Sequence, residues 1–353
     1  MGKERKKKRW VAAIIIVAIS LAILYFAGGI VAVPLVEGAI YSRRGIDPAT
    51  LLSSPYLVSK IRSDYPNLEK REVHQFRSGS NTLTGYLYDV EEEKGLFLCA
   101  HGLSGCADDD DAQYQSYLVG LGYDVFAIDL TGSGLSQGNG TGSLWQSAYD
   151  VASAYEFLNK HSLMKDRFFM IGHSWGAFGI AASLSLGVKS SGIITFSAYD
   201  NPADMEYSFA LSHAGFPVTL TTPAFYLAQF LLHDKGSRLS ASEAIGKSST
   251  SALVIQGSED ETVRLDSISL YSKVKDFPNV TPLLLEGYGH EGPWRSVSAN
   301  EYLNGFALPF YREHEGEAKS GKEKEIRSQI DIEKSSALSP VVTSAIEEFL
   351  LRN

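Results

Sequence analysis

The hydrophobic pattern divides the chain into one long apolar run and a series of short segments. Residues 11–36 pass without a single charge, directly behind a mostly basic stretch at residues 3–9. Further along, short apolar runs of strand length alternate with stretches whose apolar residues recur at helical spacing. Such alternation builds a mostly parallel sheet that helices cover on both faces. The pattern therefore predicts an α/β domain that follows a hydrophobic N-terminal helix.

The individual elements of the α/β domain follow from their periodicity. Residues 71–90 alternate around Ser78–Asn81, as a β-hairpin does. The predicted strands that follow the hairpin are residues 95–100, 123–130, 166–172, 191–198, 252–257 and 281–287. The predicted helices are residues 111–122, 143–161, 175–187 and 339–353.

Two segments interrupt the alternation. The connection over about 199–250 is long enough to predict an insertion with its own structure, often a lid. Its middle is rich in Phe and Leu with few charges, so it either covers a substrate pocket or forms a helical pair packed on the body. The second insertion, about 311–336, mixes Glu and Lys and predicts a solvated helix or a mobile excursion.

The N-terminal apolar run is long enough to cross a bilayer, which needs about 20 apolar residues. Residues 1–9 form a basic segment expected to stay cytoplasmic, and residues 10–36 a transmembrane signal anchor. Residues 37–70 are interpreted as a tether, and residues 71–353 as the main domain outside the cytoplasm. A cleaved signal peptide is the alternative, although its apolar core usually has only about 7–15 residues.

Charge and cysteine content narrow the class of protein. The net charge is −9 although the N-terminus is basic, so the main domain is acidic. An acidic domain without a basic stripe argues against nucleic-acid binding. The two cysteines, Cys99 and Cys106, are too few for a disulfide framework and are interpreted as free thiols, although a bridge between them stays possible. The acidic run Asp108–Asp111 is interpreted as a solvated helix start, with a metal site or repulsion of anionic substrates as the alternative.

The sequence G-x-S-x-G, in which many hydrolases carry a nucleophilic serine, occurs twice. Ser174 follows an apolar strand and opens a helix rich in Ala and Leu, which is the strand-turn-helix context that such a serine needs. Ser136 is followed by "QGNGTGS", whose glycines prevent a helix from starting. We therefore predict Ser174 as the nucleophile, in an elbow with Gly172, His173 and Gly176, and Ser136 as part of a structural turn.

A serine needs a histidine base that a carboxylate orients. In this type of fold the chain order is Ser, then Asp or Glu, then His. His290 lies in a glycine-rich turn after a strand, whereas His213 and His233 lie inside the predicted lid. Asp260, directly after another strand, is the preferred acid. Glu259 and Asp200 remain as alternatives.

An oxyanion hole needs two backbone N–H donors. One is expected from Trp175, the residue after the nucleophile. The other is expected from Leu103 in the loop "HGLSG", with His101 as a structural brace of that loop.

The motifs "AHGLSG", "DLTGSGLSQG", "GHSWG", "QGSEDETV" and "GYGHEGP", in this order, resemble the α/β-hydrolase fold superfamily. Within it the sequence is similar to esterase, monoacylglycerol-lipase-like and serine-aminopeptidase-like hydrolases, several of which are membrane-tethered. The resemblance covers roughly residues 72–353 without the two insertions. It implies an eight-stranded, mostly parallel sheet, no metal and no organic cofactor.

The resemblance also implies a serine hydrolase that works through an acyl-enzyme. With the apolar lid, it favours carboxylic esters with a hydrophobic or lipid-like acyl group. A membrane-anchored serine peptidase and an acyltransferase are the alternatives, and a non-catalytic binding protein is the weakest reading because no triad member is missing. The expected location is the cell membrane, with a single pass.

Overall fold

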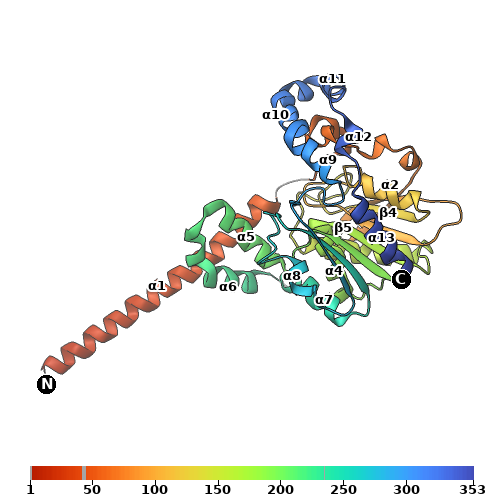
Figure 1. Cartoon of the computed structure of the whole chain (residues 1–353). Helices are drawn as coiled ribbons and strands as arrows, with labels where there is room; N and C mark the ends of the chain where they lie inside the picture. Colours follow the sequence, from red (N-terminus) through yellow and green to blue (C-terminus); the bar gives the residue numbers. More distant parts are fainter. Residues whose placement is uncertain (1, 42–44, 234) are drawn as a thin grey trace.

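The computed structural model describes residues 2–41, 45–233 and 235–353, and its centre is an eight-stranded sheet (Figure 1). The strands lie in the order β1-β2-β4-β3-β5-β6-β7-β8. The hairpin strand β2 pairs antiparallel with β1 and β4, and the remaining neighbours are parallel. The strands are β1 (Glu72–Ser78), β2 (Asn81–Tyr88), β3 (Leu96–Ala100), β4 (Asp124–Asp129), β5 (Phe168–His173), β6 (Gly192–Phe196), β7 (Ser251–Gly257) and β8 (Val280–Leu285).

Helices cover both faces of this sheet. The α-helices are α1 (Gly2–Tyr41), α2 (Ala112–Gly120), α3 (Gln146–Lys160), α4 (Ser174–Ser183), α5 (Pro202–Ala214), α6 (Thr222–Leu232), α7 (Ala241–Lys247), α8 (Leu270–Val274), α9 (Val297–Tyr302), α10 (Leu308–Glu317), α11 (Glu323–Arg327), α12 (Ile332–Ser335) and α13 (Pro340–Arg352). Buried side chains of α3, α4, α7 and α8 form the core on one face, and those of α2 and α13 form it on the other. The predicted α/β architecture is confirmed.

The four central strands are buried along their whole length. Every residue of β3, β4, β5 and β6 is buried. Parallel strands covered on both faces are expected to be continuously apolar, which is the pattern by which they were predicted. Their carboxyl ends lie at one edge of the sheet, and the loops there carry the candidate chemistry.

The segment predicted as a tether is folded against the body within its described part. Residues 42–44 lie outside the described residues. From Pro48 to Leu68 the chain forms four short helical turns, η1–η4. Leu57 and Val58 are buried against the second insertion, where Tyr311 and Ile326 are buried too. The second insertion is helical and most of its residues are exposed, in agreement with the solvated-helix alternative, while a few buried apolar residues pack it against the 48–68 segment. Its charged residues lie between a few apolar ones that contact the 48–68 segment.

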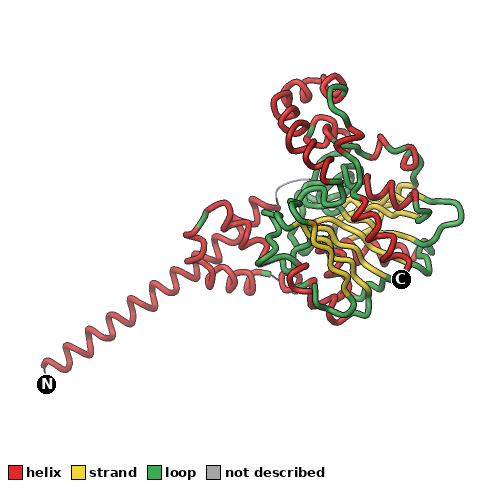
Figure 2. Tube along the Cα trace, in the orientation of Figure 1, coloured by secondary structure: helices red, strands yellow, loops and turns green. Residues whose placement is uncertain are grey.

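The long N-terminal helix α1 combines a free part and a packed part. Its residues 5–38 form a helix long and apolar enough to cross a membrane. The N-terminal part projects away from the body, whereas α5 and α6 lie beside the C-terminal part (Figures 1 and 2). The predicted lid is therefore helical, and it contacts the predicted anchor.

Candidate active site

The turn between β5 and α4 holds Ser174 in a backbone conformation that is rare outside glycine. Its φ is 49°, in the left-handed region. A Cβ at Gly172 or Gly176 would lie 2.8 or 2.1 Å from the carbonyl oxygen of Ala100 in β3. Both glycines therefore let strand and helix approach closely. Ser174 occupies the strand-to-helix turn that the sequence predicts for a nucleophile.

Three predicted residues from three loops meet at this turn. The Oγ atom of Ser174 lies 2.9 Å from Nε2 of His290. The other ring nitrogen of His290, Nδ1, lies 3.0 and 2.9 Å from the two carboxylate oxygens of Asp260. The result is one hydrogen-bonded line of serine, histidine and carboxylate, with the geometry of a catalytic triad.

The two charged members of this line shift each other's pKa. Burial lowers the pKa of His290, but the hydrogen bond and the charge of Asp260 outweigh this effect and hold the pKa above its ordinary value. Burial raises the pKa of Asp260, but the hydrogen bond from His290 outweighs it and holds that pKa below its ordinary value. Asp260 is therefore ionised at neutral pH and stabilises a positive charge on His290.

The alternative acids do not face His290. Glu259 is exposed, although it is adjacent in sequence to Asp260. Asp200 accepts hydrogen bonds from the Ser240 hydroxyl, at 3.0 Å, and from the Ser242 N–H, at 2.7 Å, at the start of α7. Its carboxylate therefore caps a helix instead of orienting a histidine.

The second G-x-S-x-G serine is engaged elsewhere. Its hydroxyl, Ser136 Oγ, donates to the carbonyl oxygen of Asp129, at 2.6 Å, and accepts from the N–H of Thr84, at 2.8 Å. These bonds fasten the loop after β4 to strand β2. Ser136 is part of a structural turn, in agreement with the prediction.

The loop after β3 passes directly beside the nucleophile. A Cβ at Gly102 would lie 3.7 Å from the Cβ of Ser174. Leu103 and Trp175 line the same cavity as Ser174. Trp175 is the second residue of α4, so its N–H is one of those that a helix start leaves without an intrahelical partner. Both predicted oxyanion donors are thus carried by backbone next to Ser174.

His101 is buried at the base of this loop. Its Nε2 accepts from the N–H of Leu130, at 3.0 Å, and its Nδ1 donates to the carbonyl oxygen of Gly102, at 2.7 Å. Burial lowers the pKa of His101 to about 4, so the ring is neutral. These contacts fit the predicted role as a brace.

Two polar residues that the sequence did not single out for this purpose support the Ser174–His290–Asp260 line. The Nε2 atom of His173 lies 3.0 Å from the carbonyl oxygen of His290. The side-chain amide of Gln256 donates to a carboxylate oxygen of Asp260, at 2.9 Å. His173 was predicted only as an elbow residue, and Gln256 lies within a strand. These two residues are close to the Ser174–His290–Asp260 line because three strand ends converge there. A short sequence pattern does not predict which strand ends meet in space.

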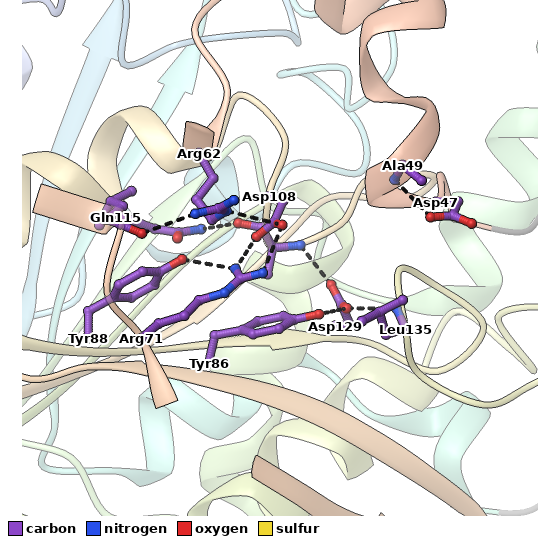
Figure 3. Close-up of polar contacts among 12 residues, drawn as sticks. Asp47, Ala49, Arg62, Arg71, Tyr86, Tyr88, Asp108, Gln115, Asp129 and Leu135 are labelled. Atoms are coloured by element: carbon purple, nitrogen blue, oxygen red, sulfur yellow. Dashed lines mark hydrogen bonds and ion pairs between the residues drawn. The ribbon is translucent and has the colours of Figure 1, made fainter. Parts of the chain in front are cut away.

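The run Asp108–Asp111 does lead into a helix, α2, with Asp111 at its N-cap, but the prediction that the run is solvated is wrong. Asp108, Asp109 and Asp111 are buried. Asp108 forms ion pairs with Arg62 and Arg71 (Figure 3). The guanidinium groups come from the segment before β1, and Asp110 pairs with Arg295 from the C-terminal part. The run joins distant segments of the chain beside the oxyanion loop.

The triad opens into a cavity of about 500 Å³. Leu144, Tyr199, Met205 and Phe209 contribute apolar surface, the last two from α5 of the predicted lid. Asp109, Asp110, Asp111 and Glu291 contribute carboxylates on its wall, together with the lid residue His213. A larger hollow of about 770 Å³ beside α7 contains no triad residue.

Cys99 and Cys106 are both free and buried.

Comparisons with known proteins agree with this description. A family model described as serine aminopeptidase, S33, matches residues 91–233, which is less than half of the chain. An esterase from Pyrococcus furiosus is 17% identical, with 74% of this chain and 91% of that chain covered and a TM-score of 0.49. Acylaminoacyl peptidase from Pyrococcus horikoshii is 19% identical, with 72% of this chain but only 41% of that chain covered and a TM-score of 0.48. The search of curated protein sequences found no match.

The fold and the family match point to the same conclusion. The sheet is mostly parallel and eight-stranded, and the serine turn lies between a strand and a helix. The family match covers the part of the chain from before β3 to the end of α6, including Ser174. The chain therefore has the architecture of the α/β-hydrolase fold, and its residues 91–233 are similar to a family of hydrolases.

Proposed function

We propose that the protein is a serine hydrolase that cleaves carboxylic esters with a hydrophobic acyl group. The observation that carries the proposal is the continuous line from Ser174 Oγ to His290 and on to Asp260, with contacts of 2.9 Å on either side of the imidazole. A hydroxyl is a poor nucleophile without such a base.

The reaction follows from the positions of these groups. His290 Nε2 takes the proton of Ser174 as Oγ attacks the ester carbonyl, and Asp260 stabilises the imidazolium that forms. The backbone N–H groups of Leu103 and Trp175 stabilise the oxyanion. His290 returns the proton to the leaving alkoxide, which departs as an alcohol. Water, deprotonated by the same histidine, then attacks the acyl-enzyme and releases the acid and the free Ser174.

The preference for a hydrophobic acyl group is supported by the cavity wall. Leu144, Met205 and Phe209 offer apolar surface next to Ser174. Burial of an acyl chain contributes about 0.8 kcal/mol for each CH₂ group, so a short apolar wall already discriminates between acids of different length.

The anchor is the second part of the proposal. A helix with Lys and Arg before its apolar span is expected to keep that end in the cytoplasm, which leaves the catalytic domain outside. The packing of α1 favours an uncleaved anchor over a signal peptide. Val33 is fully buried against Phe225 and Ala228 of α6, so removal of the helix would expose a packed surface of the lid.

A membrane-anchored aminopeptidase is the second candidate, since the family model describes serine aminopeptidases. Glu291 on the cavity wall favours this alternative, because its pKa is held below the ordinary value by His173 and His290 against the effect of burial, and an ionised carboxylate suits a substrate ammonium group. Burial raises the pKa of Asp109 and Asp111, so these two are less suited to it. An acyltransferase would use the same acyl-enzyme and differ only in the acceptor.

Labelling of the full chain with a fluorophosphonate, followed by peptide mass mapping, tests the proposal. We expect the label on the peptide that contains Ser174, with none in Ser174→Ala. A label on Ser136, or none on the folded protein, would contradict it. Hydrolysis of a panel of esters and aminoacyl amides by the labelled and unlabelled protein then separates the esterase from the aminopeptidase.

A further inference from the structure

The surface of the lid next to α1 is apolar and exposed. Four large side chains of η6 (Phe216–Thr221) and α6 are more than half exposed: Phe216 at 74%, Leu220 at 67%, Phe230 at 57% and Leu231 at 58%. We call them the lid face. From Tyr207 to His233 the chain carries no Asp, Glu, Lys or Arg. Several exposed large apolar side chains on one segment without formal charge are typical of a binding or membrane-contact surface.

Helix α1 fixes the position of the lid face. The residues of α1 that face the lid recur every four positions, at Tyr25, Gly29, Val33, Glu37 and Tyr41, which places them on one side of the helix. The Tyr25 hydroxyl donates to the carbonyl oxygen of Leu220 at 2.6 Å. A Cβ at Gly29 would lie 2.6 Å from the carbonyl oxygen of Ala224, so the two helices are in close contact.

Polar contacts close the other end of this seam. Glu37 of α1 is buried and accepts from Gln229 of α6 at 3.2 Å, and His233 contacts the same carboxylate. Tyr41 and Gln229 contact Glu206 of α5. The lid thus lies along α1 in one register, with its polar end at Glu37 and its apolar end at Tyr25.

This register sets the depth of the lid face. A bilayer core takes up about 20 residues of helix, so a span that starts at Val11 ends near Ile30. Tyr25 then lies about 8 Å inside the boundary, given a rise of about 1.5 Å per residue. Leu220, bonded to Tyr25, lies at the same depth, whereas Glu37 with Gln229 and His233 lies about 10 Å beyond the boundary. The Phe216–Leu220 end of the lid face is therefore at acyl-chain depth, and the end with Phe230 and Leu231 is at headgroup depth.

The polar groups of η6 are suited to a medium without water. The hydroxyls of Thr219, Thr221 and Thr222 donate to the carbonyl oxygens of Phe216, Val218 and Thr219 at 2.7, 2.7 and 2.8 Å. Segments at membrane depth must satisfy their own hydrogen bonds in this way. An apolar face that inserts about 5–10 Å into the acyl boundary is typical of interfacial helices.

We propose that the lid face lies in the extracytoplasmic leaflet beside α1, with lipid acyl chains as its partner. The inference rests on the proposed anchor, and it extends the proposed function to ester substrates that the membrane itself carries. Helix α5, which contributes Met205 and Phe209 to the cavity, connects directly to η6. The cavity of Ser174 and the lid face thus share one short helical segment, which brings a membrane-borne ester close to the cavity mouth.

Depth-dependent quenching of the full chain in phosphatidylcholine vesicles tests the proposal. Leu220→Cys carries an environment-sensitive fluorophore, and brominated acyl chains act as quenchers. Cys99 and Cys106 are buried, so the introduced thiol is the reactive one. The matched control is Leu351→Cys, at a leucine of α13 that is 88% exposed. We expect several-fold stronger quenching at position 220 than at position 351.

Equal quenching at the two positions would overturn the proposal. Thiol cross-linking between two copies at position 220 would also overturn it, because a second chain would then cover the face. The measurement needs no hydrolysis, so it is independent of the proposed chemistry. Mass measurement of the vesicle-bound chain shows in the same sample whether α1 is intact, which separates failure of the anchor from failure of the lid contact.

A substitution gives a second readout. Leu220→Asp is expected to reduce hydrolysis of a vesicle-borne ester several-fold and to leave hydrolysis of a short water-soluble ester unchanged, with Leu351→Asp as the control. An equal loss on both esters would indicate a folding role for Leu220 and would overturn the proposal.

Discussion

The two copies of G-x-S-x-G have the same sequence pattern and serve different purposes. Ser174 has a positive φ and a hydroxyl that contacts a histidine. The hydroxyl of Ser136 bonds only to backbone. Its loop contacts the end of α1 and the chain after it: Thr141 N–H donates to the carbonyl oxygen of Tyr41, at 3.1 Å, and Gly45 N–H to that of Gly132, at 2.9 Å. The element that follows the serine differs: a helix follows Ser174, which contacts His290, and a glycine-rich loop follows Ser136, which contacts only backbone.

The largest effect should come from removal of the hydroxyl at position 174. Ser174→Ala is expected to reduce kcat by about 10⁶-fold, the size seen when a triad nucleophile is lost. Ser136→Ala, the matched control, should stay within a few-fold of the parent protein. The measurement is steady-state hydrolysis of a chromogenic ester. Comparable losses in both variants would remove the distinction between the two serines.

The next effect concerns the acid. Asp260→Asn is expected to lower kcat by about 10⁴-fold, because an amide no longer holds the imidazole in the tautomer that the reaction needs. Asp200→Asn changes a helix cap and should leave kcat nearly unchanged. The two variants are compared by the same ester assay after circular dichroism has shown that both are folded. A larger loss in Asp200→Asn would move the acid to that strand.

The pH dependence of activity should reflect the coupling between His290 and Asp260. The base must be neutral, so activity falls as pH falls through the pKa of His290, which Asp260 holds above the ordinary value of about 6.5. In Asp260→Asn this pKa should fall, and the residual activity should extend to lower pH. The check is kcat/KM over pH 5 to about 9. An acidic limb at the same pH in both proteins would contradict the coupling.

The sequence predicted the features that depend on residues close together along the chain. The central strands were predicted to within one or two residues, because each is a continuous apolar run that ends at polar or glycine residues. The choice of Ser174 over Ser136 depended on the next few residues only. Asp260 was preferred over Glu259 from the spacing Gly257-x-x-Asp260-x-x-Val263, in which Val263 packs inward. The structure agrees, since Asp260 and Val263 are buried and Glu259 is exposed.

What the sequence could not predict depends on partners that are distant along the chain. The run Asp108–Asp111 has the pattern of a solvated helix start, but Asp108 is paired with Arg62 and Arg71, and Asp110 with Arg295. Buried Asp109 accepts instead from the backbone N–H groups of Cys106 and Asp111. The contact of α1 with α6 is of the same kind. Both segments are visibly apolar, but nothing in either indicates that Gly29 faces Ala224.

The smallest expected effect concerns the stability of the two serine variants. Ser136→Ala removes a donor to Asp129 and leaves the Thr84 N–H without its partner, at a half-buried position. We expect the free energy of unfolding to fall by about 1–3 kcal/mol, the cost of an unmade hydrogen bond in such a place. Ser174→Ala loses only the contact with His290, and His290 can bond to water in the open cavity instead. The free energy of unfolding of Ser174→Ala should therefore fall by less than that of Ser136→Ala. Urea denaturation of both variants in the same detergent measures the difference. The serine that matters for rate should then be the less important one for stability, and the reverse order would mean that the attachment loop depends on other contacts.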